Sequence, residues 1–168
     1  DLFGFCLARQ CKQVLNNGNI LEVGAGSGIL AAQILFELGR QNSLPEKYFI
    51  IELSAQLKKT QQKTLKKALP EIYDRVAWLT ELPNNFKGVV VANEVIDAFP
   101  VKRIILSNNQ FYELGVDYID NCFQWKRFEQ PYLKSEVPYR GDLPEGYTTE
   151  LSLQSDGWIK SLYDLMSD

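Results

Sequence analysis

Two kinds of hydrophobic pattern alternate over the first hundred residues. Apolar residues at helical spacing predict helices over residues 2–15, 27–38 and 54–69. Short continuous apolar runs predict strands covered on both faces, over residues 20–23, 48–53, 75–79 and 88–93. Because strands that alternate with helices are joined by right-handed crossovers, this order predicts an α/β domain with a mainly parallel, Rossmann-like sheet.

The pattern changes after Pro100, where short strand patterns follow one another without a helix between them. The expected strands cover residues 103–106, 111–114 and 122–125, with turns at 107–109 and 120–121. Strands joined by such turns predict a β-rich insertion over residues 101–131. We expect this insertion to belong to a single domain that covers residues 1–168.

The rest of the chain predicts a loop and a last helix. Residues 131–146 are rich in proline and glycine and predict a loop, whereas residues 151–166 predict a helix. The aromatic residues of the insertion are expected to form a small core of its own, with a binding surface as the alternative: Phe111, Tyr112, Tyr118, Phe123 and Trp125.

The charge of the chain argues against nucleic acid as a partner. Its 168 residues carry a net charge of −3, so no sequence-wide positive field would attract a phosphate backbone. One basic cluster falls on the helix predicted over 54–69 and is interpreted as a solvated helix face: Lys58, Lys59, Lys63, Lys66 and Lys67. No apolar run approaches the roughly 20 residues that a membrane-spanning helix needs, so membrane insertion is not expected.

The sequence contains three cysteines without CxxC spacing, and no histidine. A zinc site lacks its usual ligands, and a histidine-based nucleophile or proton relay is excluded. We expect Cys6, Cys11 and Cys122 to be reduced core residues, as in a protein of the cytosol or the mitochondrial matrix. The chain begins at Asp1 rather than at methionine, so it resembles a fragment whose native termini lie outside it.

A glycine-rich stretch, LEVGAGSGIL, follows the first predicted strand. Gly24, Gly26 and Gly28 let the backbone turn sharply and approach a ligand closely. A dinucleotide fingerprint GxGxxG would need glycine directly after Gly28, where this chain has isoleucine. Instead an acid, Glu22, lies two residues before the first glycine and can pair with a cationic group. S-adenosylmethionine carries an α-amino group and a sulfonium but no phosphate, so we predict that Glu22, Ala25 and the glycines bind this cofactor; a purely structural turn is the alternative.

Acidic residues also follow the second and fourth predicted strands. Glu52 lies where an acid binds ribose hydroxyls in Rossmann-like sheets, and we count its neighbour Leu53 with the cofactor-binding residues. Asn93, Glu94 and Asp97 lie in the stretch ANEVIDAFP, and ligands of open α/β sheets bind outside the carboxyl ends of the strands. We therefore expect all of these to face a cofactor crevice. A solvated glutamate at Glu52 and a helix cap at Asn93 remain the alternatives.

The order of LEVGAGSG, IELS and VVVANEVIDAFPV resembles the MidA family of class I S-adenosylmethionine-dependent methyltransferases. The stretches LFGFCLARQ and LPEGYTTEL resemble family positions too, so the resemblance covers essentially the whole chain. The family includes the mitochondrial complex I assembly factor that methylates an arginine of a complex I subunit. The resemblance implies a truncated methyltransferase acting on a partner protein, such as a respiratory-complex subunit, in the bacterial cytoplasm or the mitochondrial matrix.

By this resemblance, each part of the cofactor has its own residues. Glu22 and residues 24–28 hold its methionine end, Glu52 binds its ribose, and residues 78–81 lie near its adenine. The β-rich insertion over 101–131 is assigned to recognising the acceptor or covering the site.

The resemblance also implies that Asn93, Glu94 and Asp97 face the acceptor. An arginine guanidinium is normally protonated, with a pKa above about 12, so the enzyme must orient and polarise a nitrogen for attack. A carboxylate that accepts its hydrogen bonds can do this. Glu94 is the first candidate for that carboxylate, Asp97 the second and Glu150 the third.

Three other functions are open at this point. An NAD-linked oxidoreductase uses the same kind of sheet, although the missing glycine and the lack of histidine weigh against it. A non-catalytic scaffold or assembly protein could retain the cofactor fold, and a small-molecule methyltransferase could use the same cofactor. The sequence gives no basis for predicting whether the protein is a monomer or an oligomer.

Overall fold

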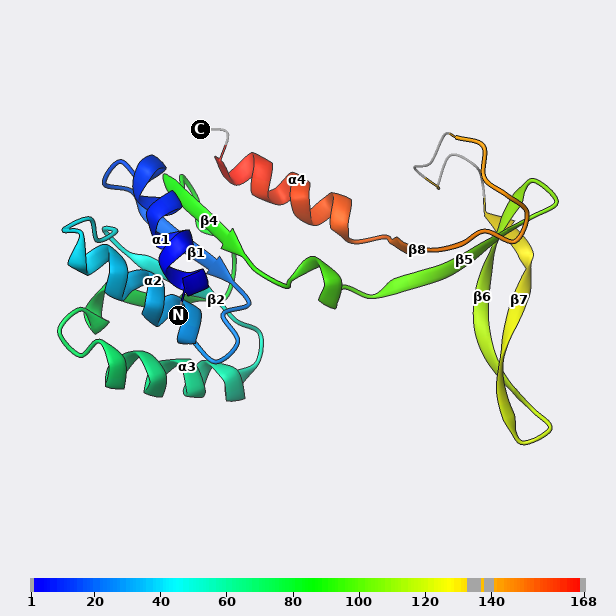
Figure 1. Cartoon of the computed structure of the whole chain (residues 1–168), viewed down its shortest axis with the longest axis horizontal. Helices are drawn as coiled ribbons and strands as arrows, with labels where there is room; N and C mark the ends of the chain where they lie inside the picture. Colours follow the sequence, from blue (N-terminus) through cyan, green and yellow to red (C-terminus); the bar gives the residue numbers. More distant parts are fainter. Residues whose placement is uncertain (1, 133–136, 138–140, 167–168) are drawn as a thin grey trace. The chain divides into compact units, whose positions relative to one another are not determined.

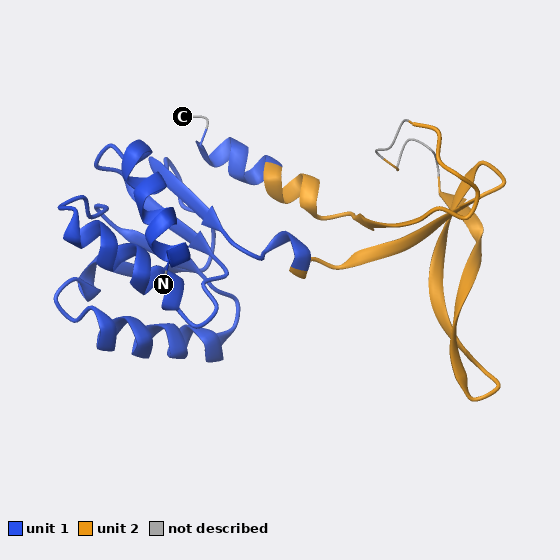
Figure 2. Cartoon of the chain, in the orientation of Figure 1, with its two compact units in different colours: residues 1–97, 160–168 blue, residues 98–159 orange. Residues whose placement is uncertain are grey.

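The computed structural model describes residues 2–132, 137 and 141–166, which form two compact units (Figures 1 and 2). The first unit contains residues 1–97 and 160–168, and the second contains residues 98–159.

The first unit alternates helices with strands, as the sequence predicts (Figure 1). Its elements, in chain order, are α1 (Leu2–Val14), β1 (Asn19–Val23), α2 (Ile29–Arg40), β2 (Tyr48–Ile51), α3 (Ala55–Ala68), η1 (Tyr73–Arg75), β3 (Val76–Leu79) and β4 (Gly88–Ala92), followed by the short helix η2 (Ile96–Ala98).

The four strands of this unit form a parallel sheet in the order β3-β2-β1-β4. Leu21 at the centre of β1 pairs with Phe49 of β2 on one side and with Val90 of β4 on the other. The chain therefore fills the sheet from β1 outward to β3 and then returns to the opposite side of β1. This reversal leaves a topological switch point at the carboxyl ends of β1 and β4. The Rossmann-like α/β fold is confirmed.

A continuous apolar core holds the helices of the first unit to its sheet. Ile20 of β1, Leu35 of α2 and Ile50 of β2 are fully buried. Helices α1 and α2 pack so closely at Gly4 that a Cβ atom there would lie 2.5 Å from the Gln33 Oε1 atom. This packing orients the helix that follows the glycine-rich loop.

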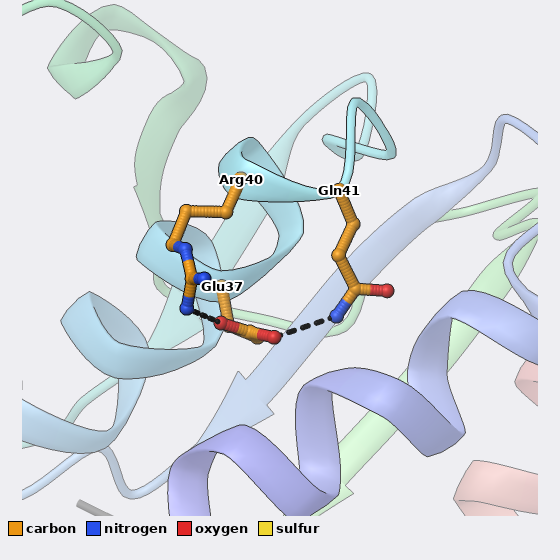
Figure 3. A network of polar contacts seen from close by, with 3 residues as sticks. All are labelled: Glu37, Arg40 and Gln41. Carbon is orange, nitrogen blue, oxygen red and sulfur yellow. Dashed lines mark hydrogen bonds and ion pairs between the residues drawn. The ribbon is translucent and has the colours of Figure 1, made fainter.

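A buried carboxylate near the end of α2 has a structural role (Figure 3). Glu37 is 5% exposed and lies near the negative end of the helix, where a carboxylate is unfavourable. The Arg40 guanidinium donates to Glu37 Oε2 over 3.0 Å, and the Gln41 amide donates to Oε1 over 2.8 Å (Figure 3). Both carboxylate oxygens thus have donors at this helix end, so Glu37 is satisfied by its own surroundings.

The second unit contains an antiparallel sheet in the order β7-β6-β5-β8. Its strands are β5 (Val101–Ser107), β6 (Gln110–Ile119), β7 (Cys122–Tyr132) and β8 (Thr148–Ser152). Helix α4 (Ser155–Met166) follows them in the chain, and its residues from Lys160 onward belong to the first unit. Two-residue loops join β5 to β6 and β6 to β7, and all four loop residues have positive φ: Asn108, Asn109, Asp120 and Asn121. Asparagine and aspartate tolerate this backbone, which confirms the predicted turns and the β-rich insertion after the fourth strand.

The strands of this sheet extend further than their sequence pattern predicts. Pro131, expected in a loop, lies in β7, where proline is tolerated because β7 is an edge strand. The last helix begins at Ser155 rather than at residue 151, because Leu151 and Ser152 pair with β5. Tertiary strand pairing overrides the local pattern at both places.

The prediction that the aromatic residues of the insertion form its core is wrong for most of them. Phe111 is buried with Ile104 and Leu106, but Phe123 is 80% exposed and Trp125 is 56% exposed. The hairpin of β6 and β7 continues beyond the part of the sheet that other segments cover. The other aromatic rings instead contact one another or arginines. The ring centres of Tyr118 and Phe123 lie 5.1 Å apart. The Arg103 guanidinium lies over the Trp125 ring, and the Arg127 guanidinium lies over the Tyr112 ring.

This difference predicts unequal effects of two similar substitutions. Phe111→Ala should lower the free energy of unfolding by about 3–5 kcal/mol, because it leaves a cavity in the core of the second unit. Phe123→Ala should lower it by less than about 1 kcal/mol, since the exposed ring loses little buried area. Urea unfolding of both variants measures the contrast, and equal losses would contradict the exposed position of the hairpin tip.

Two other expectations concern the surface. The lysine cluster of α3 is confirmed as a solvated face, with Lys59, Lys63 and Lys66 exposed. All three cysteines are free thiols, as predicted, but only Cys11 is a core residue, because Cys6 and Cys122 are exposed. In the part of the chain that the structure describes, no helix has the length and apolar character to cross a bilayer.

Candidate functional site

A cavity of about 440 Å³ lies at the switch point of the parallel sheet. Its walls come from the start of α1, the glycine-rich loop after β1, the first turns of α2 and the residues after β4. The lining residues are Phe3, Glu22, Gly24, Ala25, Gly26, Ser27, Ile29, Leu30, Gln33, Asn93 and Glu94. The fold thus brings the acid–glycine motif together with the first two residues of the predicted acceptor cluster.

Backbone geometry explains the glycines of this loop. Gly24, Gly26 and Gly28 have φ of +68°, +52° and +79°, in the left-handed region that side chains disfavour. A Cβ on Gly26 would meet nothing within 4 Å, so the backbone there is open to a ligand. A Cβ on Gly28 would lie 3.0 Å from the Gln61 Cα atom, so this glycine also allows α3 to approach the loop.

Substitution of Gly28 should therefore lower the stability of the fold by more than its positive φ alone would. Gly146 has the same φ of +79°, but a Cβ there would meet nothing within 4 Å. Gly146→Ala should cost about 1–2 kcal/mol from backbone strain. Gly28→Ala should cost roughly 1–3 kcal/mol more, because it also displaces α3. Chemical denaturation compares the two variants, and equal costs would contradict close packing of Gln61 on the loop.

Glu22 lies in the wall of the cavity and is only 2% exposed. Burial raises the pKa of its carboxyl group to about 7, and a hydrogen bond from the Tyr48 hydroxyl partly opposes this rise. The hydroxyl donates to Glu22 Oε2 over 2.8 Å, and Tyr48 is itself fully buried. A cation in the cavity would stabilise the ionised carboxylate. Sequence reasoning missed Tyr48, whose position in an apolar strand pattern gives no sign of its polar contact.

Glu52 is held by hydrogen bonds at the end of β2. Its Oε1 accepts from the Ser54 backbone N–H over 2.9 Å, and its Oε2 accepts from the Gln61 amide over 2.9 Å. The Gln61 amide also donates to the Gly26 carbonyl, and the Trp78 indole N–H donates to the Gln61 amide oxygen. These bonds join segments of three neighbouring strands. Gln61 was also missed; its one signal is that it stands four residues before the buried Leu65, on the same helix face.

Glu94 has an unusual backbone for its residue type. Its φ is +52°, and among the described residues no other side chain outside glycine, asparagine and aspartate has a positive φ. This conformation costs of order 1–3 kcal/mol and tends to occur at functional sites. The side chain is exposed and lines the cavity with Asn93.

Other candidate residues lie outside this cavity. Asp97 is exposed in η2, Leu53 is 93% exposed and Glu52 is half-buried; none of these three lines the cavity. Glu150 lies in β8 opposite Arg103 of β5. Among the described residues, no group of three or more histidine, cysteine, aspartate or glutamate side chains could hold a metal ion.

The charges around the cavity select between ligand types. Glu22 and Glu94 contribute two carboxyl groups, and none of the described residues in the lining is basic. A diphosphate would lack a cationic partner there, whereas the ammonium group of S-adenosylmethionine would have the Glu22 carboxylate as its anionic partner. The residues therefore fit S-adenosylmethionine better than NAD.

Comparisons with known proteins agree with this chemistry. Residues 4–168 match the family described as "Putative S-adenosyl-L-methionine-dependent methyltransferase". A crystal structure of a Burkholderia thailandensis protein bound to S-adenosyl-homocysteine superimposes with a TM-score of 0.87, at 33% identity over 99% of this chain and 44% of that one. A second, native structure from the same organism gives a TM-score of 0.82, at 32% identity over 99% of this chain and 46% of that one. No curated protein matches the sequence.

The chain spans less than half the length of these two structures. The family and the structure crystallised with S-adenosyl-homocysteine confirm S-adenosylmethionine as the cofactor. Together with the matched fold, they set aside the NAD-linked alternative. The chain belongs to this family of S-adenosyl-L-methionine-dependent methyltransferases.

Proposed function

We propose that this protein is a methyltransferase of the MidA kind and that it transfers the methyl group of S-adenosylmethionine to an arginine of a partner protein. The observation that carries the proposal is that the acid–glycine loop and Glu94 line the same cavity. It supports a cofactor and an acceptor meeting at the carboxyl ends of β1 and β4. The resemblance of the stretch ANEVIDAFP to the MidA pattern supports arginine as the acceptor.

In the proposed arrangement, the cofactor lies across the ends of β1, β2 and β3. The Glu22 carboxylate pairs with its α-amino group, and the backbone of residues 24–28 lies along its methionine end. Glu52 accepts hydrogen bonds from its ribose hydroxyls, and Trp78 lies near its adenine. The unshared lone pairs on both oxygens of Glu52 support this role.

The chain's own contribution to the reaction is positioning and proton transfer. When bound, the cofactor supplies a methyl group on a positively charged sulfur. Glu94 accepts hydrogen bonds from the arginine guanidinium and aims one nitrogen at that methyl carbon. A nitrogen–carbon bond forms as the carbon–sulfur bond breaks, and the guanidinium proton passes to Glu94 or to water. Asp97 is the second candidate for this carboxylate.

Exposed apolar side chains on the β6–β7 hairpin support a macromolecular acceptor. Val116 is 61% exposed, Tyr118 58% and Trp125 56%, and their strand positions place them on one face of the hairpin. Clustered apolar side chains that remain in water mark interaction surfaces. We assign this face to contact with the partner protein, which by the family resemblance is a subunit of a respiratory complex.

A labelling experiment tests this function. The protein is incubated with S-adenosylmethionine carrying a radioactive methyl group and with a protein extract, and labelled residues are identified by mass spectrometry. Methylarginine in a protein supports the proposal. Label found only in small molecules would mean that the acceptor is a small molecule rather than a protein. Cofactor binding without any methyl transfer would favour the non-catalytic scaffold.

A further inference from the structure

Gln61 is a fully buried polar residue of α3, and both the nitrogen and the oxygen of its side-chain amide make hydrogen bonds. Its Nε2 donates to the Gly26 carbonyl over 3.0 Å and to Glu52 Oε2 over 2.9 Å. Its Oε1 accepts from the Trp78 indole N–H over 2.9 Å. The reverse amide orientation would set oxygen against the carbonyl and the carboxylate. The partners therefore fix the orientation of the amide.

This arrangement determines what Glu52 can still bind. Each carboxylate oxygen has two acceptor sites, and the Ser54 N–H and the Gln61 amide occupy one on each oxygen. One site per oxygen remains, which matches two neighbouring hydroxyl donors on one ligand. A neutral amide also leaves the carboxylate its negative charge, which an arginine or lysine in the same place would neutralise.

We propose that Gln61 is a positioning residue for the cofactor: it holds Glu52 in the orientation that accepts both hydroxyls of a cis-diol and ties that carboxylate to the glycine-rich loop. The inference rests on the proposed placement of the ribose at Glu52. Since one amide contacts both Gly26 and Glu52, the part of the site for the methionine end and the part for the ribose are held in register by a single side chain.

The test compares two ligands that differ only in the diol: S-adenosyl-homocysteine and its 2′,3′-dideoxy analogue. Hydrogen bonds to a charged group predict that the wild-type chain favours the diol ligand by roughly 10–100-fold in Kd. In Gln61→Met this preference should fall to less than about threefold, as in Glu52→Gln. The double variant should show no further loss, because both changes remove the same interaction.

Two further variants separate positioning from general stability. Gln61→Glu keeps the shape of the side chain but cannot donate to Glu52 when ionised, so it should lose the diol preference as well. Leu65→Ala removes a fully buried side chain from the same helix without touching Glu52, and should keep the preference while lowering stability. If both Gln61 variants prefer the diol ligand as strongly as the wild type does, the inference about Gln61 is overturned but the proposed function is not. A wild-type chain that binds neither ligand would overturn the proposed function as well.

Discussion

Glu22→Gln is expected to make the chain more stable at pH 8 and, at the same time, to weaken its binding of S-adenosyl-homocysteine. The folded protein raises the pKa of Glu22 from 4.5 to about 7, because the carboxyl group is buried. At pH 8 the ionised group therefore destabilises the fold by roughly 3 kcal/mol, the free energy that a shift of this size represents. Glutamine removes that charge and can still accept the Tyr48 hydrogen bond.

The sign of the pH dependence follows from the same shift. Between about pH 4.5 and pH 7 the folded chain holds a proton on Glu22 that the unfolded chain has lost, so this residue lowers stability as the pH rises. Affinity for S-adenosyl-homocysteine should change in the opposite direction, rising roughly tenfold or more from pH 5.5 to pH 8, because its ammonium group pairs with the ionised carboxylate.

Calorimetry and urea unfolding at several pH values measure both effects. Glu22→Gln should remove the Glu22 contribution to each pH profile. Glu37→Gln is the matched control, because Glu37 is also buried but does not line this cavity. It should leave the affinity for S-adenosyl-homocysteine unchanged. Affinity that is independent of pH in the wild type would contradict the pairing of Glu22 with the ligand.

Glu94→Gln should lower the rate of methyl transfer by roughly 10²–10⁴-fold, the usual contribution of a proton-transferring side chain. Cofactor affinity should change little, because the carboxylate acts on the acceptor. Asp97→Asn is the matched comparison, because Asp97 is also an exposed acid after β4 but does not line the cavity. Asp97→Asn should therefore lower the rate of methyl transfer less than Glu94→Gln does. Equal rates for Glu94→Gln and wild type, with the acceptor identified by labelling, would remove Glu94 from the mechanism.

A second substitution at this position separates function from backbone strain. Asparagine tolerates the φ of +52° that Glu94 adopts, so Glu94→Asn should be as stable as the wild type or up to about 1 kcal/mol more stable. It should be as inactive as Glu94→Gln. Stability retained while activity is lost would show that the strained backbone serves the reaction rather than the fold.

The sequence predicts those parts of this fold that depend on local pattern. Apolar runs between helical segments predict the parallel sheet, and Asn108–Asn109 and Asp120–Asn121 predict the two hairpin turns because they tolerate positive φ. The spacing of Glu22 and the glycines also predicts the loop that lines the cavity. Each of these signals lies within a few residues of the structure that it specifies.

The remaining features depend on contacts between distant residues. Gln61 meets Gly26, Glu52 and Trp78 only after α3 has packed against the strand ends, and Tyr48 meets Glu22 only when β2 pairs with β1. Burial fails as a prediction for the same reason: Phe111 and Phe123 have the same side chain, yet Phe111 is buried in the core of the second unit and Phe123 is 80% exposed. Local sequence cannot distinguish them.

Calorimetric titration of the chain with S-adenosyl-homocysteine tests the proposed cofactor site most directly, with NAD and the variant Gly26→Val as controls. Gly26 faces open space at the cavity, so valine there should block the ligand while the fold persists with strained backbone. We expect micromolar binding to the wild type, no heat with NAD and no binding to Gly26→Val. Equal affinity in the variant and the wild type, or binding of NAD in place of S-adenosyl-homocysteine, would contradict a cofactor site at the glycine-rich loop.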